Sequence, residues 1–377
     1  MTQLQEAAEI KKHNLGRLQI NRFCNQRCVF CSAPPVGGEL SFEEIKKRMT
    51  RLKEEGTTDL MITGGEPTIK RDLIEILELA QSMGFEEITI QSNGSNLYRK
   101  EFVEKLTQFK NLKFNISFHA SDPVIFTKLS KAPHTYKNPL EGLKNLGRYG
   151  ISVFLTIVIQ TDNYKHLKSH VQFVRNHYPF ISHFSFNFID PIYNAKENVW
   201  TVPTFSEAMP YMHETFSYIL EQGCTFRIEK IPLCFLRGFE AYQSNLRRHL
   251  FDEIRTNSFF RVKGDYMPDD WYKEEGKSEQ FYPPQCKECK LQSICPGVNQ
   301  NYVEVHGTDE IKPVFDRDPG EILDIARDSK GKSTSSMNTV SSNSSLDSIQ
   351  ILKKQIADDL TLFDHAIQMK PNKNNIY

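Results

Sequence analysis

Residues 15–31 read LGRLQINRFCNQRCVFC, a strand-like segment that runs directly into three cysteines. Residues 15–22 have the mixed apolar and polar composition of a β-strand. Cys24, Cys28 and Cys31 follow with the spacing C-x3-C-x2-C. If the segment is the first strand of a sheet, the three thiols lie in the loop at its carboxyl end.

Strand-like and helix-like segments alternate from about residue 15 to residue 221. Ser41, with Glu44 three residues later, predicts a capping box and a helix that ends at Gly56. The further strands are expected at residues 58–63, 86–91, 112–118, 151–159 and 183–189, and the further helices at 72–84, 100–108, 138–149, 164–178 and 205–223. Such alternation predicts a parallel sheet with right-handed crossovers. Six strand–helix units are too few for an eight-unit barrel, so we expect an α/β fold with a partial (β/α)6 TIM-type barrel.

The rest of the chain divides by composition. Residues 1–14 form an N-terminal extension, and the barrel takes residues 15–223. Residues 224–327, with Cys234 and three further cysteines, are expected to form a small second domain organised by metal. Residues 328–348 are a Ser/Asn-rich linker that begins a flexible tail. In residues 349–377 apolar side chains recur at helical spacing, which predicts an amphipathic helix that docks on the body or on a partner.

Composition excludes several classes of protein. The 377 residues contain 47 Lys and Arg against 47 Asp and Glu, a balance that disfavours nucleic acid as a partner. Eight cysteines are too dilute for a disulfide-stapled secreted scaffold. The first residues lack an apolar run of signal-peptide length, and no stretch is apolar enough to span a membrane. We therefore expect a soluble cytoplasmic protein with reduced thiols and no membrane association.

The first three cysteines suit an iron–sulfur cluster better than a structural zinc ion. A structural zinc site takes four ligands, whereas thiolates favour iron–sulfur clusters. A [4Fe-4S] cluster held by Cys24, Cys28 and Cys31 would have one iron without a protein ligand. An open iron can hold a substrate or a cofactor.

The motif resembles that of the radical S-adenosylmethionine (radical SAM) superfamily. The match rests on the cysteine spacing, on Phe30 just before the third cysteine, and on Gly64-Gly65-Glu66-Pro67 after the second strand. The resemblance implies that the open iron chelates S-adenosylmethionine. An electron from the cluster then cleaves the sulfonium, and the 5′-deoxyadenosyl radical takes a hydrogen atom from the substrate. It also implies an electron-donating partner such as flavodoxin or ferredoxin.

The same resemblance assigns further residues to the cofactor. Gly64, Gly65, Glu66 and Pro67 would hold the methionine amino group. Polar residues at the ends of later strands would contact the rest of the cofactor: Ser92, Asn93, Ser117 and Asn163. The alternative for each of these four is an ordinary turn or cap residue.

A second set of cysteines has the spacing C-x2-C-x5-C, at Cys286, Cys289 and Cys295. Cys234 is the nearest fourth ligand, and Cys224 is the alternative to it. A zinc site and a second, auxiliary [4Fe-4S] cluster both fit four cysteines. The spacing resembles the SPASM/twitch extensions of radical SAM enzymes, which favours a single fully ligated cluster that conducts electrons or staples the fold.

Two residues at strand ends are acid–base candidates. His119 follows the fourth strand and Asp190 follows the sixth. Either could position or deprotonate a substrate, although each could also be a hydrogen-bonded turn residue.

The resemblance leaves three functions open. The first is a maturase that modifies a peptide or protein, because the auxiliary-cluster subfamily is rich in such enzymes. The second oxidises or rearranges a small molecule such as a sugar, an amino acid or a cofactor precursor. The third, of another class, is a non-enzymatic iron–sulfur sensor or scaffold.

Overall fold

The computed structural model describes residues 14–34, 38–250 and 281–327. The chain divides into two compact units, Met1–Ala326 and Arg327–Tyr377. The N-terminal extension, apart from residue 14, lies outside the described residues. The expected linker and C-terminal helix lie outside them as well.

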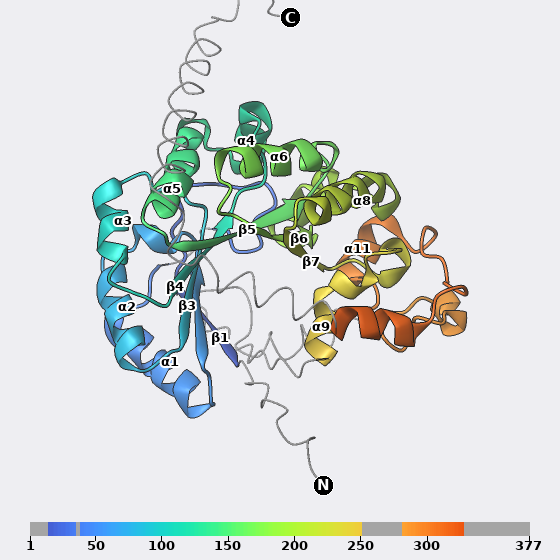
Figure 1. Ribbon diagram of the computed structural model, residues 1–377, viewed down its shortest axis with the longest axis horizontal. Helices are drawn as coiled ribbons and strands as arrows, with labels where there is room; N and C mark the ends of the chain where they lie inside the picture. The colour runs from blue at the N-terminus through green and yellow to red at the C-terminus, as the bar shows by residue number, and fades with distance from the viewer. Residues whose placement is uncertain (1–13, 35–37, 251–280, 328–377) are drawn as a thin grey trace, which may run out of the picture. The chain divides into compact units, whose positions relative to one another are not determined.

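A parallel sheet of seven strands forms the centre of the first unit (Figure 1). The strands follow one another in chain order and have the bounds β1 (Leu15–Asn21), β2 (Asp59–Gly64), β3 (Glu87–Ser92), β4 (Leu112–Ser117), β5 (Ser152–Ile159), β6 (His183–Phe188) and β7 (Thr225–Glu229). The α-helices between and after them are α1 (Phe42–Glu54), α2 (Leu73–Ser82), α3 (Lys100–Leu106), α4 (Pro123–Ser130), α5 (Lys137–Arg148), α6 (Leu167–His177), α7 (Asn194–Glu197), α8 (Phe205–Glu221), α9 (Ser244–Leu250) and α11 (Gln300–His306). This α/β arrangement confirms the expected partial barrel.

The sheet has one strand more than the six expected. β7 pairs with β6 in parallel, from His183 opposite Thr225 to Asn187 opposite Glu229. It therefore extends the sheet past residue 223, where we placed the end of the barrel. The five-residue segment TFRIE falls within residues 224–327, which we expected to form the next domain because the composition changes there.

The two faces of the sheet differ in polarity. A Cβ at Gly16 would meet side chains of Leu52 and Thr57, so the face with Gly16, Leu18 and Ile20 looks toward α1. In register, the helix-facing residues of the other strands are buried and apolar, as in Phe114 and Ile116 of β4. The opposite face carries Arg17 and Gln19 of β1, Lys113 and Asn115 of β4, Ser185 and Asn187 of β6, and Arg227 and Glu229 of β7. Parallel sheets covered on both faces are usually apolar throughout. The inner wall of this partial barrel is thus built for polar contacts.

Helix caps fix several of the turns around the sheet. Ser41 Oγ accepts from the backbone N–H of Glu44 at 3.2 Å, as expected, but the Glu44 carboxylate pairs with Arg48 at 2.6 Å. A complete capping box occurs instead at α8, between Thr204 and Glu207. Short 3-10 turns join several elements: η1 (Pro67–Ile69), η2 (Pro133–Thr135), η3 (Tyr164–His166), η4 (Val199–Thr201), η5 (Leu233–Phe235), η6 (Glu240–Tyr242) and η7 (Pro284–Glu288).

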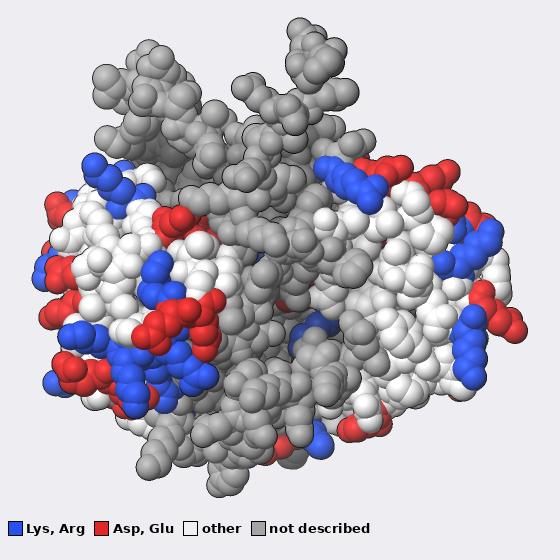
Figure 2. Space-filling model, turned by 90° about the horizontal axis from the view of Figure 1, so that it is seen from below, with Lys and Arg blue, Asp and Glu red and all other residues white. Residues whose placement is uncertain are grey.

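Acidic and basic side chains are interspersed on the face drawn in Figure 2, without a large area of one sign among the described residues. This distribution agrees with the equal numbers of acidic and basic residues in the chain. None of the described helices combines the length and the apolar character that a membrane span needs.

Candidate functional site

The three cysteines of the first motif occupy the loop after β1, at the carboxyl edge of the sheet. The backbone N–H of Gln26 donates to Cys24 Sγ and that of Ala33 to Cys31 Sγ, each at 3.4 Å. Burial raises the pKa of the Cys24 thiol to about 11, and burial followed by the charges of Cys31 and Cys24 raises that of Cys28. The thiols are therefore close enough to repel one another as anions. Such a site favours a bound cationic cluster that keeps them deprotonated.

No group of three His, Cys, Asp or Glu side chains among the described residues is arranged to hold a single metal ion. An iron–sulfur cluster bonds each thiolate to a different iron. The fit of the loop to such a cluster rests on its donor set, three thiols with backbone N–H groups directed at two of them.

Gly64 and Gly65 make room for the cysteine loop itself. A Cβ at Gly65 would lie 2.1 Å from the carbonyl oxygen of Phe23, and one at Gly64 would lie 2.4 Å from Oδ1 of Asn21. The backbone N–H of Gly65 donates to the Asn21 carbonyl at 2.9 Å. The resemblance assigns this segment to the methionine amino group of the cofactor. Among the described residues, the nearest neighbour of both glycines is the chain that leads to Cys24, so the absence of a side chain also leaves room for that chain.

Glu66 is fully buried and connects the ends of two strands. Its carboxylate accepts from the backbone N–H and the hydroxyl of Thr68, at 3.0 and 2.5 Å. It also accepts from the Ser92 hydroxyl and from the backbone N–H of Asn93, both at 2.7 Å. Burial raises the pKa of Glu66, and these hydrogen bonds lower it. The carboxylate thus organises the loops after β2 and β3, and Pro67, also buried, begins η1 beside it.

Asn93 joins this network to the first cysteine. Its side-chain nitrogen donates to Asn25 Oδ1 at 2.8 Å and lies 3.8 Å from Cys24 Sγ. Its side-chain oxygen accepts from the backbone N–H of Ser95 at 2.9 Å. Asn93 and Ser92, both expected near the cofactor, therefore lie beside the cysteine loop.

Asn163 and Ser117 have different surroundings. The Asn163 amide is buried and donates to the carbonyls of His119, at 3.0 Å, and Val158, at 2.9 Å. Its oxygen accepts from the backbone N–H of Gln160 at 2.9 Å. These contacts are those of a turn residue. Ser117 is partly buried at the end of β4, on the polar face of the sheet.

His119 faces Phe30, whose ring centroid lies 4.9 Å from that of the imidazole in an edge arrangement. The backbone N–H of Val158 donates to Nδ1 of His119 at 3.1 Å. Burial lowers the pKa of His119 to about 3, so the ring is neutral near pH 7 and carries its proton on Nε2. The geometry suits a residue that positions or donates a hydrogen bond, not one that takes up a proton.

Asp190 takes part in a link between distant parts of the chain. Its carboxylate pairs with Lys230, just after β7, and accepts a hydrogen bond of 3.0 Å from Asn301 of α11. Both carboxylate oxygens therefore have protein partners. This arrangement favours the turn-residue alternative over a catalytic role.

The second set of cysteines surrounds one pocket of about 340 Å³. Cys234, Cys286, Cys289 and Cys295 all line it. Burial, then the charges of Cys295 and Cys286, raises the pKa of Cys234 to about 12. Cys224 does not line this pocket; it is buried beside Arg175. The structure therefore places Cys234, and not Cys224, with Cys286, Cys289 and Cys295 around this pocket.

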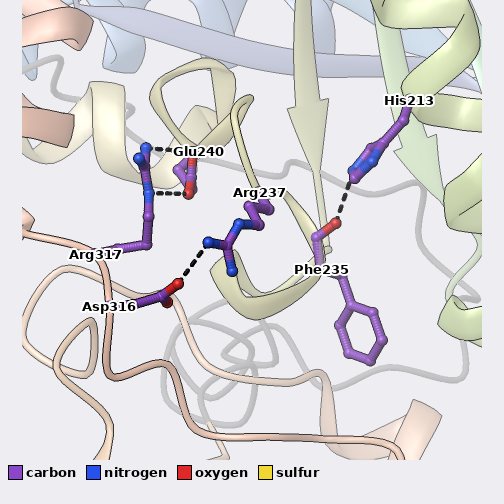
Figure 3. Close-up of polar contacts among 6 residues, drawn as sticks. All are labelled: His213, Phe235, Arg237, Glu240, Asp316 and Arg317. Carbon is purple, nitrogen blue, oxygen red and sulfur yellow. Dashed lines mark hydrogen bonds and ion pairs between the residues drawn. The ribbon is translucent and has the colours of Figure 1, made fainter.

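Backbone donors and ion pairs fix the walls of this pocket. The N–H groups of Leu233 and Gly297 donate to Cys295 Sγ at 3.5 and 3.4 Å, and that of Val314 donates to Cys289 Sγ at 3.3 Å. Figure 3 shows how the segment after Cys234 is anchored. His213 bonds to the Phe235 carbonyl at 2.9 Å, Arg237 pairs with Asp316, and Arg317 binds Glu240 with two nitrogens.

Sequence reasoning missed the polar inner wall of the barrel. Strands such as RLQIN and KFNIS alternate polar and apolar residues, which in a parallel sheet is the signal for one polar face. It also missed Gln160, which follows β5. Gln160 is fully buried, and neither its side-chain nitrogen nor its oxygen has a hydrogen-bond partner among the described residues.

Residues 18–174 match the family model described as the Radical SAM superfamily. The match spans β1 to α6 and so includes both the first cysteine loop and the Gly64–Pro67 segment. It ends before Cys234, Cys286, Cys289 and Cys295, which line the second pocket, called the auxiliary pocket below.

Curated relatives match less than half of the chain. A probable GTP 3′,8-cyclase of Methanopyrus kandleri is 29% identical over 160 residues, which are 41% of this chain and 51% of the relative. A GTP 3′,8-cyclase of Rhodopirellula baltica is 31% identical over 131 residues, 33% of this chain and 36% of the relative. The chain spans about half the length of the first of these relatives and less of the second.

Solved structures resemble a larger part of the fold. SuiB of Streptococcus suis, bound to S-adenosylmethionine, aligns with a TM-score of 0.54 at 17% identity. The alignment covers 81% of this chain and 76% of the SuiB chain. anSMEcpe, with bound AdoMet and a Kp18Cys peptide, aligns with a TM-score of 0.58 at 13% identity. The alignment covers 84% of this chain and 99% of the anSMEcpe chain. At these identities the likeness is one of fold.

Proposed function

We propose that this radical SAM enzyme, whose residues 18–174 match the Radical SAM superfamily, cleaves S-adenosylmethionine reductively and removes a hydrogen atom from a bound substrate. The observation that carries the proposal is the close packing of Gly64 and Gly65 against Asn21–Phe23, the segment that leads directly into Cys24. A [4Fe-4S] cluster bound there would supply the electron that cleaves the sulfonium and so yields the 5′-deoxyadenosyl radical. A flavodoxin or ferredoxin would supply that electron to the protein.

Side chains of the protein would hold the reactants in position. Glu66 locks the loops after β2 and β3 together, and Asn93 extends this network to Cys24. The buried amide of Gln160, without a protein partner among the described residues, offers a donor and an acceptor at the carboxyl end of β5. A buried amide is costly when unpaired, so it supports a ligand group at this edge of the sheet. The polar inner wall would hold the substrate, because a carbon radical must meet one chosen hydrogen.

The four thiols of the auxiliary pocket support a second [4Fe-4S] cluster with a complete ligand set. A cluster without an open iron suits electron transfer or structural support and not substrate binding. We therefore propose an overall two-electron oxidation of the substrate. A cluster held by Cys234, Cys286, Cys289 and Cys295 would accept the electron of the substrate radical and pass it to the oxidised flavodoxin or ferredoxin, while the proton would leave to the solvent.

A peptide or protein is our first candidate for the substrate. The fold likeness to anSMEcpe, whose structure contains a peptide, extends over 84% of this chain and so beyond the family match. A small polar molecule is the second candidate, favoured by the names of the curated relatives as GTP 3′,8-cyclases and by the polar inner wall. That sequence likeness covers only 41% and 33% of this chain.

Anaerobic reconstitution with iron and sulfide, followed by dithionite and S-adenosylmethionine, tests the proposed activity. We expect 5′-deoxyadenosine and methionine in equal amounts from the wild type and none from the Cys28→Ala variant. An iron-loaded wild type that forms no deoxyadenosine would point to a sensor or scaffold. GTP and peptides encoded next to the gene should then be compared as substrates, with deuterium transfer into deoxyadenosine as the readout.

A further inference from the structure

Arg227 lies in the middle of β7, on the polar inner face of the sheet, and its side chain is held in one orientation. Its Nε donates a hydrogen bond of 2.9 Å to Oγ of Ser185 on β6. Its guanidinium carbon lies 5.8 Å from the ring centroid of Phe154 on β5. The hydroxyl and the ring together orient the planar group, so little side-chain entropy remains to be lost when a ligand binds.

The two terminal nitrogens of Arg227 remain available. Within the part of the chain that the structure describes, neither donates a hydrogen bond, and no carboxylate pairs with the guanidinium. The side chain is only partly buried. A guanidinium presents its N–H donors in a planar fork that matches a carboxylate or a phosphate.

The surroundings of Arg227 carry further positive charge. His183 stands on the same face, bonded through Nδ1 to Thr225 Oγ1 at 2.8 Å. Burial, then Arg227 and Arg247, lowers the pKa of His183 to about 3. The positive charges of Arg227 and Arg247 thus both disfavour protonation of the His183 imidazole. The acidic residue nearest along the strand, Glu229, has interactions of its own.

Arg227 is also in register with the site at the cysteine loop. Ser117, Thr156, Ser185 and Arg227 occupy paired positions across β4, β5, β6 and β7. At about 4.8 Å between neighbouring strands, the row spans about 14 Å along the sheet from Ser117 to Arg227. A row of three hydroxyls therefore leads from the edge expected to hold the cofactor to an oriented cation.

We propose that Arg227 binds an anionic group of the substrate, a carboxylate or a phosphate, while the carbon that loses hydrogen lies near the end of β4. The inference rests on the proposed function for the identity of the reacting group. It narrows the substrate to a polar molecule or peptide segment that carries an anionic group about 14 Å from the carbon that loses hydrogen.

Calorimetric titration of the reconstituted full chain with inorganic pyrophosphate and, separately, with succinate tests this proposal. Arg227→Gln removes the charge and the fork, and Arg227→Lys retains the charge alone. Arg148→Gln is the matched control, because Arg148 is exposed on α5 and also bonds to one neutral side chain, Asn145. Thermal unfolding of each variant verifies that it is folded.

We expect Arg227→Gln to weaken the binding of at least one anion about tenfold or more, Arg227→Lys to weaken it less, and Arg148→Gln to leave it unchanged. A preference for pyrophosphate indicates a phosphate, and a preference for succinate indicates a carboxylate. A wild type that binds neither anion, or equal affinities in wild type and Arg227→Gln, would overturn the proposal. Deoxyadenosine formation by the wild type, measured without either anion, tests the proposed function independently.

Discussion

The Ser92 hydroxyl donates a hydrogen bond of 2.7 Å to the Glu66 carboxylate, although the two residues follow different strands. The carboxylate has no contact with solvent and receives three further donors from Thr68 and Asn93. Glu66→Gln would turn an NH2 group toward at least one of these donors. We expect it to lower the free energy of unfolding by about 2–3 kcal/mol, measured by urea titration.

Glu44→Gln is the control for that substitution. Glu44 pairs with Arg48 one turn away on the surface of α1, with 38% of its side chain exposed. Such a pair contributes about 0.5 kcal/mol or less. Equal effects of the two substitutions would contradict the organising role of Glu66.

Gly65→Ala tests whether the glycine positions the cysteine loop. The new Cβ would lie 2.1 Å from a backbone oxygen of Phe23, so the chain that leads to Cys24 must move. We expect the reconstituted variant to lose most of the iron of the first cluster. Gly38→Ala, whose Cβ would meet nothing within 4 Å, should bind as much iron as the wild type. Full loading of Gly65→Ala would show that the loop tolerates the displacement.

The sequence was informative wherever function depends on residues close together in the chain. The Cys24–Cys31 spacing and the Gly64–Pro67 segment each lie in one loop, and the structure brings those two loops into contact. Periodicity and caps located the strands from β1 to β6 and the helices between them, except for the eight-residue helix α4 (Pro123–Ser130), which was not expected.

Contacts between distant residues could not be read in this way. Nothing in the sequence indicates that Asp190 pairs with Lys230 and Asn301, because these partners lie 40 and 111 residues further along the chain. β7 has five residues, too few for its alternation to outweigh the change in composition around it. The choice between Cys224 and Cys234 likewise needed the pocket, since both precede the C-x2-C-x5-C motif.

The auxiliary pocket predicts different effects for two cysteines that are ten residues apart. Cys234 lines the pocket, so Cys234→Ala should reduce the iron bound after reconstitution from about eight to about four atoms per chain. Cys224 is buried elsewhere, so Cys224→Ala should retain about eight. Iron analysis together with Mössbauer spectra would separate the two clusters. The reverse pattern would make Cys224 the ligand.

Asp190 should act through structure, since Lys230 and Asn301 occupy its carboxylate. We expect Asp190→Asn to lower the free energy of unfolding by about 1–3 kcal/mol, because it removes the charge that faces the partly buried ammonium of Lys230. Asp316→Asn breaks the pair with Arg237, in which 58% and 68% of the side chains are exposed, and should lower the free energy of unfolding by less than Asp190→Asn does. Comparable losses in urea titrations would argue against a structural role.

His183 makes stability depend on pH in a defined direction. Its pKa is lowered to about 3 in the folded chain, from an ordinary value near 6.5, chiefly by burial. As the pH falls below about 6.5, the unfolded chain binds a proton that the folded chain does not, so stability is lost by up to about 1.4 kcal/mol per pH unit. His183→Gln should remove this contribution, so that urea titrations between pH 7 and 5 show a shallower loss. His134→Gln, at an exposed position in η2, should keep the wild-type slope, and an identical slope for His183→Gln would mean that His183 is protonated in the folded chain.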